Sequence, residues 1–215
     1  RRQRQMCIRD RDDMAENYFD TVAKEWNTPE RMKNTTSLAE DLLIKIGVES
    51  APLVKALEIG SGSGMLAVLL SKHFKKIDCI DSSSGMREEF LQNKEKYSAE
   101  NIFIYGEEYL DSTDEKYDLI YSHKAFHHIV DVEGELRKLK RVMAKGGRLF
   151  LIDFCTIPPE FHKDFPNFDG HHGFSKEEIS DYFQNAGLKL AEYEIIRQGK
   201  SKDIDYNLFL AVGII

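Results

Sequence analysis

The chain has 215 residues, of which 41% are hydrophobic, and a formal net charge of −7 at pH 7. This size supports one substantial core, so we expect a single domain over residues 12–215. The negative charge disfavours a nucleic-acid backbone as partner, and every apolar stretch is shorter than the ~20 residues of a membrane helix.

Residues 1–11 differ from the rest of the chain because they hold five arginines and a single acid, Asp10. They lack the apolar segment of a signal peptide and the Ser-rich amphipathic pattern of a transit peptide. We therefore interpret them as a disordered tail or as sequence foreign to the domain.

The remaining chain alternates between expected helices and strands. Helices are predicted at 13–26, at 37–46 with the capping-box pair Ser37 and Glu40, and at 65–74, 133–144 and 175–186. Strands are predicted at 53–59, 77–81, 101–105, 117–122, 147–154, 188–197 and 206–214. The polar turn 198–205 is too short for a parallel crossover, so the last two strands should form an antiparallel hairpin. The order predicts an α/β fold with a doubly wound sheet, five parallel strands and a hairpin edge, preceded by a helical cap at about 12–47.

The loop after the first expected strand is the most informative segment. There Leu57-Glu58-Ile59 runs into Gly60-Ser61-Gly62-Ser63-Gly64, where glycines allow a tight turn and a close approach of ligand to backbone. Asp81 ends the next strand, where an acid can accept hydrogen bonds from both hydroxyls of a ribose. Together they predict an adenosine-containing ligand. The third glycine comes one residue too early for the dinucleotide fingerprint.

The spacing Glu58-x-Gly60-x-Gly62-x-Gly64 instead resembles the first motif of the class I S-adenosylmethionine-dependent methyltransferases. Similar to later family motifs are Ile80-Asp81-Ser82-Ser83-Ser84-Gly85-Met86, Gly106-Glu107-Glu108, residues 117–122 with Phe126-His127-His128, and Lys145-Gly146-Gly147. The stretch His171-His172-Gly173-Phe174-Ser175 resembles the type 11 branch, which includes quinone-biosynthesis enzymes. These resemblances span residue 18 to the C-terminus in the family's order.

The resemblance implies a Rossmann-like, mostly parallel sheet of seven strands in the order 3-2-1-4-5-7-6. It implies S-adenosyl-L-methionine as cofactor and a small molecule as methyl acceptor. The cofactor-binding residues it implies are Glu58, Gly60, Ser61, Gly62, Gly64, Asp81, Ser82, Met86, Glu107 and Ser122.

The loops at 60–64 and 122–128 should meet where the winding of the sheet reverses, between strands one and four. We expect only one of the adjacent His127 and His128 to face the ligand, and we favour His128. His128, His171 and Asp153 are the candidate catalytic residues, as base or as substrate anchor.

Two other segments could border the site. The connection 155–174 is long enough to be a lid, and Phe154, Phe161, Phe165 and Phe168 on or beside it either line an apolar pocket or cover the sheet edge. Phe19, Val22 and Trp26 have the spacing of a core-packed helix face, whereas the resemblance implies a helix that caps the cofactor.

Competing functions are a nucleic-acid or protein methyltransferase and a non-catalytic S-adenosylmethionine-binding protein. Amino-methylating nucleic-acid enzymes carry Asn/Asp-Pro-Pro-Tyr/Phe after strand four, where this chain has Ser122-His123-Lys124-Ala125. A protein without catalysis would be expected to lose Asp81 or a loop glycine, and this chain keeps them. Cys7, Cys79 and Cys155 form no metal-binding spacing, which favours inert thiols in a reducing cytoplasm. The sequence leaves the oligomeric state open.

Overall fold

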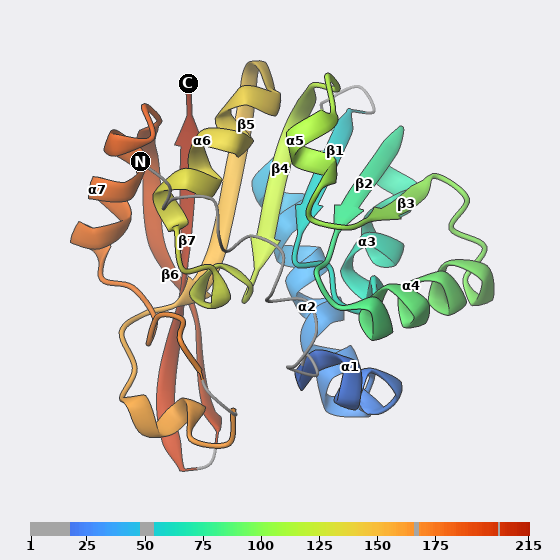
Figure 1. Cartoon of the computed structure of the whole chain (residues 1–215), viewed down its shortest axis with the longest axis horizontal. Helices are drawn as coiled ribbons and strands as arrows, with labels where there is room; N and C mark the ends of the chain where they lie inside the picture. Colours follow the sequence, from blue (N-terminus) through green and yellow to red (C-terminus); the bar gives the residue numbers. More distant parts are fainter. Residues whose placement is uncertain (1–17, 48–53, 166–167, 202) are drawn as a thin grey trace, which may run out of the picture.

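The computed structural model describes residues 18–47, 54–165, 168–201 and 203–215. Its sheet has seven strands in the order β3-β2-β1-β4-β5-β7-β6, with helices on both faces (Figure 1). This confirms the strand order expected from the resemblance. Our interpretation of residues 1–11 falls outside the described residues.

Five strands run parallel and a hairpin completes the sheet. The strands are β1 Lys55–Ile59, β2 Lys76–Ile80, β3 Ile102–Tyr105, β4 Tyr117–His123, β5 Met143–Phe154, β6 Lys189–Ser201 and β7 Ile204–Ile214. β7 lies antiparallel between β5 and β6, as predicted.

The predicted hairpin turn at 198–205 was wrong in extent. β6 and β7 remain paired as far as Ser201 opposite Ile204, so most of this polar stretch is strand. Figure 1 shows that this end of the hairpin extends beyond the neighbouring strands. A strand end that projects past the core satisfies its backbone through the ladder and needs no apolar side chains.

The helical segments are α1 Tyr18–Val22, η1 Ala23–Glu25, α2 Pro29–Ile46, α3 Met65–Leu70, η3 Ser71–His73, α4 Ser84–Lys96, α5 Tyr109–Ser112, η4 Phe126–His128, α6 Val132–Val142, η5 Pro159–His162 and α7 Lys176–Asn185. The predicted start of a helix at Ser37 was wrong. α2 begins at Pro29, and the Thr28 hydroxyl accepts a hydrogen bond from the Arg31 amide at 3.2 Å. A Thr cap followed by Pro is a stronger start signal than the later Ser and Glu pair.

Two hydrophobic clusters cover the two faces of the sheet. Leu38 and Leu42 of α2 pack with α3 and with Phe90 of α4 on one face. Leu136 of α6 and Phe183 of α7 pack against the other face. Because both faces are covered, the carboxyl ends of the parallel strands are where this fold leaves room for a ligand.

Candidate active site

The loop between β1 and α3 has a backbone that requires glycine. Gly60, Gly62 and Gly64 have φ values of +68°, +53° and +77°. A Cβ on Gly60 would lie 2.2 Å from the Cβ of Ala125, and one on Gly64 would lie 2.3 Å from the Phe90 ring. The loop therefore packs directly against the segment after β4, and the start of α3 packs against α4.

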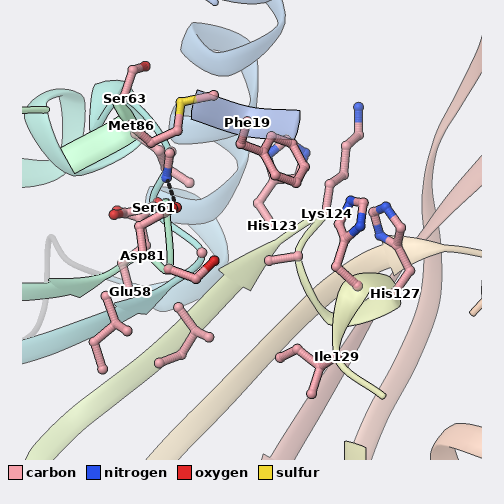
Figure 2. A pocket seen from close by; sticks show the side chains of 18 of the residues that line it. Phe19, Glu58, Ser61, Ser63, Asp81, Met86, His123, Lys124, His127 and Ile129 are labelled. Atoms are coloured by element: carbon pink, nitrogen blue, oxygen red, sulfur yellow. Dashed lines mark hydrogen bonds between the residues drawn. The ribbon is translucent and has the colours of Figure 1, made fainter. Parts of the chain in front are cut away.

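Asp81, which follows β2, holds this loop in place. Its Oδ2 accepts a hydrogen bond from the Gly62 amide at 2.6 Å, and its Oδ1 accepts one from the Ser83 amide at 3.0 Å. Burial raises the pKa of Asp81 above its ordinary value, although both amide hydrogen bonds act to lower it. Each oxygen keeps acceptor capacity, and the side chain borders the cavity (Figure 2).

A cavity of about 830 Å³ opens beside the loop, within the size range of small-molecule sites. Eight of the predicted cofactor-binding residues line it: Glu58, Gly60, Ser61, Gly62, Asp81, Ser82, Met86 and Glu107. Gly64 and Ser122 do not. Gly64 caps α3, and the buried Ser122 hydroxyl donates to the Ile59 carbonyl at 2.9 Å, tying β4 to β1.

The segment from α1 to α2 covers the cavity. Tyr18, Phe19 and Trp26 line it, so the core packing suggested by the spacing of Phe19 and Trp26 was wrong, and the position fits the capping helix that the resemblance implies. Asp20 anchors the segment, because its Oδ1 accepts hydrogen bonds from the Ser83 hydroxyl at 2.6 Å and the Gly85 amide at 2.7 Å. The apolar spacing reflects contact with the cavity and with other rings, such as Phe19 on Trp26 at 5.7 Å between centroids.

Glu58 is a buried acid at the edge of the cavity. The Tyr121 hydroxyl donates to its Oε2 at 3.2 Å, and the Cys79 thiol lies 3.8 Å from the same oxygen. Burial raises the pKa of Glu58 from its ordinary 4.5 to about 8, with a further contribution from the negative charge of Asp81. The side chain is therefore protonated at neutral pH in the free protein.

This pKa predicts a stability difference between wild type and Glu58→Gln that depends on pH. Between pH 4.5 and about 8 folded Glu58 keeps a proton that the unfolded chain releases, so raising the pH favours unfolding. At ~1.4 kcal/mol per pKa unit, wild type should lose roughly 2–4 kcal/mol relative to Glu58→Gln between pH 5 and pH 9. Urea unfolding of both proteins at the two pH values measures this. Parallel pH profiles would contradict the protonated state of Glu58.

His127 and Asp153 form a buried pair at the other end of the cavity. His127 Nδ1 lies 2.7 Å from Asp153 Oδ1, and the His127 amide donates to Asp153 Oδ2 at 3.1 Å. Burial acts to raise the pKa of Asp153, but His127 and the hydrogen bonds bring it below its ordinary value. Asp153, on β5, does not line the cavity, whereas His127 does. The carboxylate therefore orients the ring, and the ring faces the ligand space.

His128 also lines the cavity, so the prediction that only one of the two histidines faces it was wrong. The two residues lie in η4, where three residues make a turn, and their rings are tilted at 42° with centroids 4.1 Å apart. Burial, and then the proximity of His127, lower the pKa of His128 to about 3. His128 is therefore neutral at physiological pH and a weak base.

His171 does not line the cavity. Its Nε2 lies 3.3 Å from the Val130 carbonyl, and its ring lies beside Phe174. Its amide donates to the His127 carbonyl at 2.7 Å. His171 thus supports the loop that carries His127.

The connection after β5 contributes aromatic walls. Phe161, His162 and Phe165 line the cavity together with Phe154, in agreement with the pocket interpretation of these three phenylalanines. Phe168 does not line the cavity and instead stacks on His162, with 4.0 Å between the ring centroids. No sequence pattern favoured His127 over His128 as the facing residue, and none marked the further lining residues Arg31, His123, Lys124 and Tyr206. No local motif marks Tyr206, which reaches the cavity from the last strand.

The described residues contain no cluster of three or more His, Cys, Asp or Glu side chains that could hold a metal ion. In the same part of the chain, no helix is both long and apolar enough to cross a bilayer.

A family model described as a methyltransferase domain matches residues 11–193. Among curated proteins, the uncharacterized methyltransferase YcgJ of Bacillus subtilis is 31% identical over 53% of this chain and 46% of its own length. The malonyl-[acyl-carrier protein] O-methyltransferase of Priestia megaterium is 30% identical over 65% of this chain and 56% of its own. A ribosomal RNA small subunit methyltransferase C of Actinobacillus pleuropneumoniae is 26% identical over 48% of this chain and 33% of its own length.

The chain spans about half the length of the first curated relatives it matches. Among solved structures, a methyltransferase of Haloferax volcanii in complex with its Trm112 activator superposes with a TM-score of 0.67. The two sequences are 18% identical, and the superposition covers 94% of this chain and 99% of the Haloferax volcanii chain. It shows a shared fold.

Proposed function

The chain belongs to the methyltransferase domain family, and on that premise we propose that it transfers a methyl group from S-adenosylmethionine to a small-molecule acceptor. The observation that carries the proposal is the joint position around one cavity of Asp81, the glycine loop and His127, whose ring is held from behind by Asp153. The finer assignment to the quinone-like type 11 branch is part of the proposal and depends on the segment His171-His172-Gly173-Phe174-Ser175.

The residues on the β1 and β2 side fit the cofactor. Asp81 has free acceptor positions for ribose hydroxyls, and the glycine loop lets the ligand approach the backbone. Glu58 is a buried acid that a cationic ligand would ionise. When bound, S-adenosylmethionine supplies an electrophilic methyl group on a positively charged sulfur.

The protein contributes alignment, exclusion of water and removal of a proton where the acceptor carries one. Phe19, Phe161 and Phe165 surround the acceptor end with apolar surface. We assign the role of base to His127, since Asp153 at its Nδ1 leaves Nε2 as the ring atom available to an acceptor. The low pKa of His128 makes it a neutral wall residue in this assignment, and Asp153 and His171 position His127.

A small acceptor is favoured over a nucleic acid by the aromatic cover of the cavity and by the net charge of −7. The Pro-Pro segment of amino-methylating nucleic-acid enzymes is also missing after β4. Protein methylation and cofactor binding without catalysis are the remaining alternatives.

The test is methyl transfer from radiolabelled S-adenosylmethionine into fractions of a cell extract. We expect the label to enter the low-molecular-mass filtrate, and transfer to be unchanged after nuclease or protease treatment. Binding of S-adenosylmethionine with NAD as the negative control, measured by calorimetry, tests the cofactor separately.

Each other outcome identifies an alternative. Loss of acceptor on nuclease or protease treatment would indicate a macromolecular substrate. Binding of S-adenosylmethionine without labelling of any fraction would favour a non-catalytic protein. Binding of NAD alone would contradict the cofactor assignment.

A further inference from the structure

Lys124 has an unusual backbone conformation at the point where β4 enters the cavity. Its φ is +56°, a left-handed value that is uncommon for lysine and carries a local energetic cost. Its amide donates to the Ile152 carbonyl at 2.8 Å, so the turn begins directly from the sheet ladder. The result is a lysine side chain that lines the cavity next to His127 (Figure 2).

The Lys124 ammonium lies among aromatic rings. Its Nζ is 5.4 Å from the centroid of the Phe154 ring and 5.5 Å from that of Tyr206. No carboxylate of the described residues lies within ion-pair distance of it. Both oxygens of nearby Asp153 are engaged by His127. Burial lowers the pKa of Lys124, as expected for a cation without a paired anion.

The carboxylic acids that line the cavity come from elements other than those around Lys124. Those lining it are Glu58, Asp81, Glu107, Asp131 and Glu135, from β1, the loops after β2 and β3, and the start of α6. The neighbouring cation Arg197 already pairs with Asp41. Asp153 on β5 acts on Lys124 through its charge but does not line the cavity, so the cavity wall formed by β4, β5 and β7 presents aromatic rings and the Lys124 ammonium.

The cofactor's own carboxylate has a different candidate partner. Arg31 stacks over Trp26 at 3.7 Å, and the Trp26 indole nitrogen lies 3.6 Å from where a Cβ of Gly62 would be. Arg31 is thus beside the glycine loop, although its charge also helps to lower the pKa of Lys124, whereas the Lys124 ammonium contacts the rings of Phe154 on β5 and Tyr206 on β7. Figure 2 shows this separation, with Glu58, Asp81 and Met86 on one side and Lys124 with His127 on the other.

We propose that Lys124 binds a carboxylate of the methyl acceptor, and that the acceptor has an apolar body that packs against Phe154, Phe161 and Tyr206. A charge-assisted hydrogen bond from a partly desolvated ammonium selects an anion over a neutral group of the same shape. The proposal rests on the proposed function, because it names the class of acceptor for the same site.

The test compares carboxylates with amides of the same shape as ligands of the full chain saturated with S-adenosylhomocysteine. The probes are 4-phenylbutyrate against 4-phenylbutyramide and octanoate against octanamide, measured by calorimetry. In wild type we expect at least one carboxylate to bind about tenfold or more tightly than its amide. Lys124→Gln should remove this preference while amide affinity changes less than about threefold, and Lys124→Arg should keep most of it.

Lys138→Gln is the matched control, since Lys138 also borders the cavity but pairs with Asp111 and Glu135. It should leave the carboxylate preference intact. No carboxylate preference in wild type, or a preference that survives Lys124→Gln, would overturn the proposal. A loss of S-adenosylhomocysteine affinity in Lys124→Gln, with the preference retained, would assign Lys124 to the cofactor. Failure of wild type to bind S-adenosylhomocysteine would count against the proposed function, and the probe series alone would still test the anion site.

Discussion

Asp81→Ala is expected to weaken binding of S-adenosylmethionine by about 10- to 100-fold, or ~1.5–3 kcal/mol. The carboxylate has two roles in the proposed site. It would accept hydrogen bonds from the ribose, and it also holds the glycine loop through the Gly62 and Ser83 amides. Alanine removes both roles, so part of the loss should come from a less ordered loop. Calorimetry with S-adenosylmethionine and with S-adenosylhomocysteine measures the change.

Two variants separate these roles. Asp81→Asn keeps one acceptor oxygen but places an amide NH2 against a backbone N–H, so we expect an intermediate loss. Asp181→Ala, on the exposed surface of α7, is the control and should bind as wild type. An Asp81→Ala affinity within threefold of wild type, in a protein that unfolds at the wild-type temperature, would remove Asp81 from the site.

His127→Ala is expected to lower turnover by roughly 10²- to 10⁴-fold while leaving cofactor affinity within about threefold. A group that removes a proton in the transition state affects kcat without changing ground-state binding of the cofactor. His128→Ala should cost no more than about tenfold, since a ring with a pKa of about 3 is a poor base at pH 7. Turnover is compared from initial rates with the acceptor found in the extract filtrate. Cofactor affinity is compared by calorimetry.

Asp153→Asn tests the positioning part of this assignment. The amide can still accept from His127 Nδ1, but it no longer carries the charge that stabilises a protonated ring, so kcat should fall and its pH profile should shift. A purely structural role for Asp153 would lower the unfolding temperature without moving the pH profile. Equal losses in His127→Ala and His128→Ala would contradict the choice of His127 as base.

Features that depend on consecutive residues could be predicted from the sequence. The glycine loop after β1 and the acid after β2 are local signals, because only glycine tolerates the positive φ and the close contacts observed at Gly60 and Gly64. Alternating apolar segments predicted the strands, and the short final connection predicted the antiparallel hairpin. The start of α2 was missed because two start signals compete in that segment, and the Thr28–Pro29 cap dominates.

The sequence by itself determined the class of fold and the position of the glycine loop, since both follow from short-range patterns and chain connectivity. The resemblance to the methyltransferase family implied the order of the strands, which the structure has. Tertiary structure alone decided which side chains meet at the end of the cavity opposite the glycine loop. The pairing of His127 with Asp153, the exclusion of His171 from the cavity and the gathering of Lys124, Phe154 and Tyr206 join residues of different strands. Contacts across strands depend on register and on the turns between elements, so no periodicity along the chain encodes them.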